Sequence, residues 1–194
     1  MAKSAQAAKV AAKVAQAVRV EPLAGRISGG AGVTLTPANP ASRISLRADS
    51  ANAKALSKVL GLDLPLAPKT SASNAKGRLA LWLGPDEWLI IDESGDPMGD
   101  LAKARVLHSA TDISHRNTAI VVAGKGARAT LEGGCPQNLS DAAFPVGAAA
   151  RTVLGKIEVV IHRSGETDYR VECWRSFSDY AFGFLTETSK DCLA

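Results

Sequence analysis

The stretch LWLGPDEWLIID (residues 81–92) consists of two apolar runs on either side of the turn sequence Gly-Pro-Asp-Glu. Proline has a preset φ at the second position of a four-residue turn and aspartate suits the third, so the sequence predicts a β-hairpin with a type I turn. The turn brings Trp82 near Trp88, where a cross-strand aromatic pair stabilises the sheet. We therefore expect Asp86 and Glu87 to lie at an exposed hairpin tip, without the burial that a catalytic carboxylate pair requires.

The order strand, helix, loop, hairpin occurs twice in the chain. The first copy begins with the alternating run RISLRA (43–48), continues with a helix that ends at Leu60, and closes with the hairpin of residues 81–92. The second copy begins with the strand TAIVVAG (118–124), continues with a short helix, and closes with a hairpin that turns around residues 163–167. This repetition predicts an α+β protein with two similar lobes, each a helix-backed, mostly antiparallel β-sheet.

The composition of successive segments predicts the domain organisation. A basic, alanine-rich helical arm occupies residues 1–20, and a glycine- and proline-rich segment, either a linker or an irregular entry segment, occupies residues 21–42. One domain follows over residues 43–194, with lobe 1 at about 43–113 and lobe 2 at about 114–188.

The net charge of +4 lies entirely on the N-terminal arm. Of the 23 lysines and arginines, four precede the first acidic residue, and the other 19 equal the 19 aspartates and glutamates. The body is therefore neutral, which argues against a nucleic-acid partner. Valines at 10, 14 and 18 give the arm a narrow apolar stripe. Three interpretations of the arm stay open: a frayed extension, a helix that docks on a partner subunit, and a cleaved targeting peptide.

Composition excludes several classes of protein. No apolar run approaches the roughly 18 residues that a membrane span needs. Cys135, Cys173 and Cys192 lie far apart and form no C-x-x-C pair, so neither a zinc knuckle nor a disulfide framework is indicated. We expect a reducing, cytoplasmic setting with no membrane association.

Two motifs have the outline of a functional site. Gly124, Gly126 and Ala129 form G-x-G-x-x-A after a strand. However, the helix that follows is too short for a dinucleotide-binding crossover, so a tight strand-to-helix turn is favoured. The segment TDISHRN (111–117) gathers an aspartate, a serine and a histidine, but alternation along a strand end points the histidine away from the other two, and a catalytic triad needs it between them. A binding role at a loop stays open for His115 and Arg116.

Six of the nine aromatic residues lie between Tyr169 and Phe184. On the predicted C-terminal helix, Phe177, Tyr180, Ala181 and Phe184 form one stripe, which predicts a core-facing side. Phe182 lies roughly 140° from Phe177 on the helical wheel, outside that stripe. It is therefore exposed or covered by something else, and it joins His115 and Arg116 as a candidate for a partner interface. The residues alone assign no catalytic, cofactor-binding or metal-binding position.

Several phrases together resemble the gamma subunit family of heterotetrameric sarcosine oxidase over residues 20–188. They are PLAG (22–25), LGLDLP (60–65), ALWLGPDEWLII (80–91), TDISHR (111–116), GCPQNL (134–139), FPVGAAARTVL (144–154) and RSFSDYAFGFL (175–185). The resemblance implies a fold similar to the glycine-cleavage aminomethyltransferase and other folate-binding T-like domains.

The resemblance also implies a non-catalytic structural role in an enzyme that oxidatively demethylates sarcosine to glycine. It implies alpha, beta and delta subunits as partners, which hold FAD, FMN, NAD and tetrahydrofolate, while this chain holds no cofactor. The alternative is a stand-alone, folate-dependent aminomethyltransferase-like or folate-binding accessory protein. One departure argues against this alternative: where aminomethyltransferases carry an asparagine-rich segment before a catalytic aspartate, this chain reads DESGDPMGDL (92–101).

Overall fold

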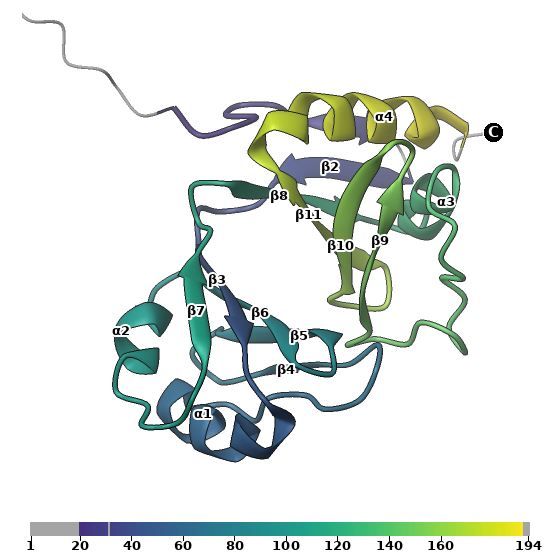
Figure 1. The fold of residues 1–194 in the computed structure, drawn as a ribbon. Helices are drawn as coiled ribbons and strands as arrows, with labels where there is room; N and C mark the ends of the chain where they lie inside the picture. Colours follow the sequence, from purple (N-terminus) through teal and green to yellow (C-terminus); the bar gives the residue numbers. More distant parts are fainter. Residues whose placement is uncertain (1–19, 31, 192–194) are drawn as a thin grey trace, which may run out of the picture.

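The computed structural model describes residues 20–30 and 32–191, so the predicted arm lies outside the described part except for Val20. Two antiparallel sheets form the molecule, and Figure 1 shows them one above the other, with helices on their outer sides. The inner faces of the sheets are turned toward each other. The expected α+β architecture of two similar lobes is present.

The first sheet has the strand order β4-β5-β6-β3-β7. Two helices cover its outer face, and the buried side chains between them include Leu56, Leu60, Trp88 and Ile90. The Asp49 side chain accepts a hydrogen bond from the backbone N–H of Ala51 and so caps the first helical turn. The elements are β3 (Ser42–Arg47), the 3-10 helix η1 (Ser50–Asn52), α1 (Ala53–Leu60), β4 (Ser71–Ser73), β5 (Leu79–Gly84), β6 (Glu87–Asp92), α2 (Pro97–Leu101) and β7 (Ser109–Asp112).

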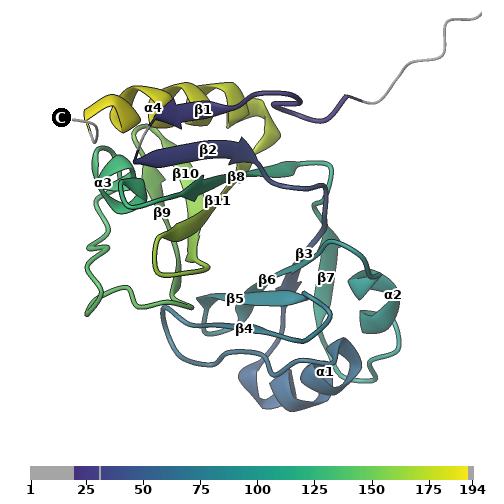
Figure 2. The ribbon, with the colours of Figure 1, turned by 180° about the vertical axis from the view of Figure 1, so that it is seen from behind.

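The second sheet has the order β1-β2-β8-β11-β10-β9. Helices α3 and α4 cover it, with α4 along the top of the molecule in Figures 1 and 2. Its elements are β1 (Ser28–Gly30), β2 (Val33–Pro37), β8 (Asn117–Ala123), α3 (Ala127–Glu132), β9 (Ala149–Leu154), β10 (Ile157–Arg163), β11 (Asp168–Trp174), the 3-10 helix η2 (Arg175–Phe177) and α4 (Ser178–Lys190).

The prediction that residues 21–42 form a linker or irregular segment is wrong where strands β1 and β2 lie. The glycines and prolines of this segment flank the two short strands, which pair with each other, and β2 also pairs with β8. Val33 and Leu35 point into the core of the second sheet and are buried there. The segment is therefore part of lobe 2, because alternating apolar residues in β2 complete that core.

The second sheet takes strand β2 from the segment that precedes the first sheet in the chain. Strand β2 comes just before β3 in the chain but pairs with β8, whereas β7 comes just before β8 but pairs with β3. The order β4-β5-β6-β3-β7 thus corresponds to β9-β10-β11-β8-β2. This correspondence confirms the predicted repeat. The first sheet is built from one contiguous segment, β3 to β7, whereas the second sheet combines β1 and β2 with β8 to β11.

The hairpin of residues 81–92 forms as predicted, with one difference. Trp82 and Trp88 are register partners across β5 and β6, and Asp86 is exposed in the turn. Glu87, however, is buried, so the expectation of an exposed tip is wrong for this residue. The register shifts between Trp82 and Gly84, and the opposite lobe covers the Glu87 side of the turn.

Candidate functional site

The inner faces of the two sheets meet along an interface between the lobes. On β11 the side chains of Tyr169, Val171 and Cys173 pack in the core of lobe 2, so alternation directs Arg170, Glu172 and Trp174 toward lobe 1. An apolar cluster also spans the interface; its members are Leu81, Leu89, Ile91 and Ile113 with Ala149 and Val160. The interface therefore combines an apolar centre with charged groups around it.

Glu172 lies at the centre of a buried charge network. Its Oε2 accepts a hydrogen bond from Arg43 Nε at 2.7 Å, and its Oε1 accepts one from Arg170 Nε at 2.8 Å. Arg170 Nη1 also lies 3.4 Å from Glu93 Oε1. Opposite charges and hydrogen bonds on both carboxylate oxygens offset the cost of burying this group. The network holds the lobes together.

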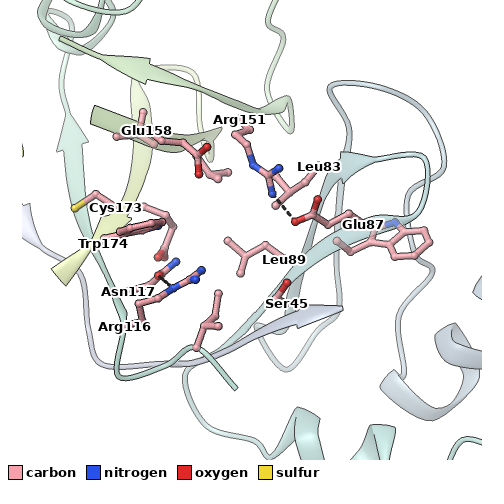
Figure 3. A pocket seen from close by; sticks show the side chains of 15 residues that line it. Ser45, Leu83, Glu87, Leu89, Arg116, Asn117, Arg151, Glu158, Cys173 and Trp174 are labelled. Carbon is pink, nitrogen blue, oxygen red and sulfur yellow. Dashed lines mark hydrogen bonds and ion pairs between the residues drawn. The ribbon is translucent and has the colours of Figure 1, made fainter. Parts of the chain in front are cut away.

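A second set of charges surrounds Glu87, and Figure 3 shows its ion pair with Arg151. Its two carboxylate oxygens bind Arg47 from β3 and Arg151 from β9. A cavity of about 50 Å³ lies beside this cluster, between the lobes. Small-molecule sites usually enclose about 300–1,000 Å³, and a space of this size holds only a few water molecules.

A serine and a histidine also meet across the lobes. Ser71 Oγ donates to the Gly147 carbonyl at 2.6 Å, so it accepts from His162 Nε2 at 3.2 Å. Burial, and then the charge of Arg170, lowers the pKa of His162 to about 4. The imidazole is therefore neutral at pH 7 and donates toward the serine, which is the reverse of the proton transfer that activates a serine nucleophile.

The segment TDISHRN does not form a triad. Ser114 Oγ donates to Asp112 Oδ1 and accepts from the backbone N–H of Arg43 at 2.9 Å. The hydrogen bonds from Ser114 hold the pKa of Asp112 below its usual value. His115 is exposed in the turn between β7 and β8, as alternation predicts, and Arg116 is exposed beside it.

The acids of DESGDPMGDL stabilise the fold. Asp92 and Asp100 each bind the buried guanidinium of Arg78, at 2.7 and 2.9 Å. Burial works against the charge on Asp92, but hydrogen bonds from Arg78, Ser94 and Gly95 lower its pKa overall. The side chain of Asp96 caps α2 by accepting from the backbone N–H of Gly99. All three aspartates therefore have structural partners.

The aromatic side chains near the C-terminus that are buried are not the ones that the predicted stripe places in the core. Phe182 is only 6% exposed, because β1 packs along α4 and Arg26 lies over its ring, 5.8 Å from the centroid. Phe182 is thus part of the core and is not an exposed interface residue, which corrects the expectation. Phe177 and Tyr180, predicted to be core, are partly exposed.

Trp174 and Phe177 stack with ring centroids 5.7 Å apart and planes inclined by 14°. The guanidinium carbon of Arg116 lies 5.1 Å from the Trp174 ring centroid, and Figure 3 shows it beneath that ring at the mouth of the cavity. We call Arg116, Trp174 and Phe177 the aromatic rim. The sequence singles out only Arg116 of these three residues. It places Phe177 in the core-facing stripe of the helix and assigns no role to Trp174.

Comparison with known protein families places this two-lobed chain in one family. The family model of the sarcosine oxidase gamma subunit matches residues 45–191. The chain belongs to the sarcosine oxidase gamma subunit family. Relatives in this family include the sarcosine oxidase subunit gamma of Arthrobacter sp., 34% identical over 76% of this chain and 75% of that protein. The corresponding subunit of Corynebacterium sp. (strain U-96) is 28% identical over 87% of this chain and 84% of that protein.

Solved structures extend the comparison of this gamma-family chain. A chain of the heterotetrameric sarcosine oxidase from Corynebacterium sp. U-96, in complex with pyrrole 2-carboxylate, superposes with a TM-score of 0.80 and 27% identity, over 91% of this chain and 97% of that chain. The glycine cleavage system aminomethyltransferase T of Bartonella henselae superposes with a TM-score of 0.56 and 14% identity, over 80% of this chain and 45% of that chain. The second likeness concerns the fold alone, and it confirms the expected T-like architecture.

Residues 20–30 and 32–191 contain no group of three or more histidine, cysteine, aspartate or glutamate residues arranged to hold a metal ion. Within the same residues, no helix has both the length and the apolar character needed to cross a membrane.

Proposed function

We propose that this chain is a structural, non-catalytic subunit of a heterotetrameric sarcosine oxidase, the enzyme that oxidatively demethylates sarcosine to glycine. The observation that carries the proposal is the superposition on a chain of such a heterotetramer over nearly the full length of both chains. A shared fold over the whole length is what two subunits with the same place in an assembly require.

The chemistry of the interface between the lobes supports the non-catalytic role. Glu172 and Glu87 are each held by two arginines, and Ser114 and Ser71 both donate to fixed acceptors. A general base or nucleophile needs a free lone pair or a transferable proton directed at substrate. These groups are already used within the fold.

The likeness to the sarcosine oxidase gamma subunit also suggests the partners and cofactors of this chain. Alpha, beta and delta subunits complete the complex, and they hold FAD, FMN, NAD and tetrahydrofolate. The setting is cytoplasmic, in keeping with the free, buried thiols of Cys135 and Cys173.

Co-expression tests the proposal. The chain is expressed alone and together with candidate alpha, beta and delta subunits, and complex size, flavin absorbance and sarcosine-dependent peroxide production are measured. We expect the isolated chain to show neither flavin colour nor peroxide production, and the co-expressed chain to co-purify with the others. The proposal is contradicted if the chain co-purifies with none of the three subunits, or if the isolated chain oxidises sarcosine.

The fold likeness to aminomethyltransferase T favours one alternative, a stand-alone folate-dependent aminomethyltransferase-like or folate-binding accessory protein. Titration calorimetry of the isolated chain with tetrahydrofolate separates the two. Binding in the micromolar range supports the alternative, and the absence of heat at 1 mM ligand supports the structural role.

A further inference from the structure

The aromatic rim is a rigid, accessible surface. Trp174 is 41% exposed and Phe177 is 37% exposed, although each is among the largest apolar side chains of the protein. Trp174 ends β11 and Phe177 lies in η2, so both are fixed by backbone structure. The backbone N–H of Arg175 donates to the Arg116 carbonyl at 2.7 Å and ties the β7–β8 turn to the stack. A surface that is ordered before binding loses little conformational entropy on association.

The positive charge beside this stack is not neutralised within the described residues. Arg116 Nε donates to Asn117 Oδ1 at 3.2 Å, and Arg175 Nη2 donates to the Val20 carbonyl at 2.8 Å. Neither guanidinium forms an ion pair with a carboxylate of residues 20–30 or 32–191, whereas other arginines at the interface between the lobes do. The paired ones are Arg43, Arg47, Arg151 and Arg170. The rim therefore combines exposed aromatic area with two arginines that form no ion pair within the described part of the chain.

Charge determines which occupant fits this surface. A second copy of the chain would bring the same arginines together, and like charges facing each other weaken an interface. The chain's own residues 1–19 carry four cations and no acid, so they are repelled in the same way. A partner that presents carboxylates is attracted, and Trp and Arg are the side chains that most often dominate the binding energy of interfaces.

We propose that the aromatic rim is the docking surface for an acidic segment of a companion subunit in the sarcosine oxidase complex. A carboxylate of that segment pairs with Arg116, and an apolar side chain packs on the stacked rings of Trp174 and Phe177. This inference rests on the proposed function and adds the surface and the chemistry of its partner.

Competitive incorporation tests it in the assembled complex. Tagged variants and untagged wild-type chain are co-expressed with the companion subunits, and the ratio of the two in the purified complex is compared with the ratio in the lysate. We expect Trp174→Ala, Phe177→Ala and Arg116→Glu each to be depleted about tenfold or more, as for hot-spot residues. Arg116→Lys keeps the charge and should recover part of the incorporation.

Matched controls come from lobe 1. Arg105→Glu reverses an exposed arginine far from the rim, and Leu107→Ala shortens a side chain that is 88% exposed. Both should be incorporated like the wild type. Phe177→Ala does not touch the cavity between the lobes, so it keeps the test valid if Trp174→Ala fails to fold, and thermal unfolding of each purified variant checks this.

The outcomes separate the inference from the proposed function. Full incorporation of all three rim variants overturns the rim as the docking surface, while the structural role stands. A wild-type chain that never enters the complex overturns both. An isolated chain that dimerises in size-exclusion chromatography, and becomes monomeric on Phe177→Ala, shows that the occupant is a second copy and overturns the inference.

Discussion

Arg43 of lobe 1 and Glu172 of lobe 2 form a buried ion pair, with 2.7 Å between Nε and Oε2 and side chains only 4% and 1% exposed. The two residues are 129 positions apart in the sequence. The backbone N–H of Arg43 also donates to Ser114, next to the β7–β8 turn. One arginine thus contacts both lobes and the turn that carries Arg116, so the stability of the lobe interface and the position of the aromatic rim depend on the same residue.

Glu172→Ala is expected to lower the free energy of unfolding by about 3–5 kcal/mol, because it leaves the buried Arg43 without its counterion and leaves Arg170 paired with Glu93 alone. Urea denaturation followed by circular dichroism measures the change. The control is Asp179→Ala, which breaks the Arg26–Asp179 pair, where the aspartate side chain is 79% exposed. That change should cost less than about 1 kcal/mol. Equal effects of the two substitutions would contradict a network that depends on burial.

Leu35→Ala is expected to cost about 2–5 kcal/mol, because Leu35 in β2 is fully buried in the core of lobe 2. Leu66→Ala serves as the control, since the same atoms are removed from a side chain that is 61% exposed, and it should cost little. A Leu35→Ala protein as stable as the wild type would indicate that residues 21–42 act as a linker after all.

The parts of the fold that could be predicted are those with local causes. The hairpin of residues 81–92 follows from proline and aspartate in a turn between apolar runs, and the helix ending at Leu60 follows from its cap and Gly61. Strands β1 and β2 were missed because short strands flanked by glycine and proline have too few residues for alternation to stand out. The pairing of β2 with β8, a strand more than 80 residues later in the chain, has no local signal.

The site was harder to predict because burial of its charges depends on the opposite lobe. From the sequence, Glu87 is a turn residue; its burial depends on packing of the opposite lobe, from which Arg151, 64 positions away, binds its carboxylate. Phe182 lay outside the predicted core stripe because the wheel considers one helix alone, whereas β1 covers a second side of α4. Arg116 could be singled out as a loop cation, but its contact with Trp174 requires the tertiary structure.

Gly124→Ala tests the turn formed by the G-x-G-x-x-A motif. Gly124 has φ +115°, and an added Cβ would lie 2.5 Å from the Gly32 carbonyl oxygen, so both backbone strain and a clash follow. We expect a loss of more than about 1 kcal/mol in unfolding free energy. Gly183→Ala is the control: the residue lies within α4 with nothing within 4 Å of the added methyl, so alanine should stabilise the helix by up to about 1 kcal/mol. If both substitutions changed the free energy of unfolding in the same direction, the backbone strain and clash assigned to Gly124 would be contradicted.

His162 predicts a distinctive dependence of stability on pH. Its pKa is lowered to about 4 in the folded protein, from an ordinary value of 6.5, mainly by burial. Between these values the unfolded chain binds a proton that the folded chain does not, so stability rises with pH. The contribution is complete above about pH 6.5 and is lost as pH falls toward 4, by up to about 3 kcal/mol. The lowered pKa values of Asp92, Asp100 and Asp112 also make stability fall as pH falls, but mainly below about pH 5, at the acid end of this window.

Urea unfolding of the wild type and of His162→Gln between pH 4.5 and 7.5 checks this prediction. Glutamine keeps an N–H that can donate to Ser71 Oγ, but it does not titrate. The wild type should lose stability across this range relative to the variant, because protonation of the imidazole opposite Arg170 on β11 is unfavourable in the folded state. The difference between the two proteins isolates the histidine from every other titrating group. Parallel curves would mean that the imidazole is protonated within the fold as readily as in the unfolded chain, and that the interface between the lobes is open to water at this point.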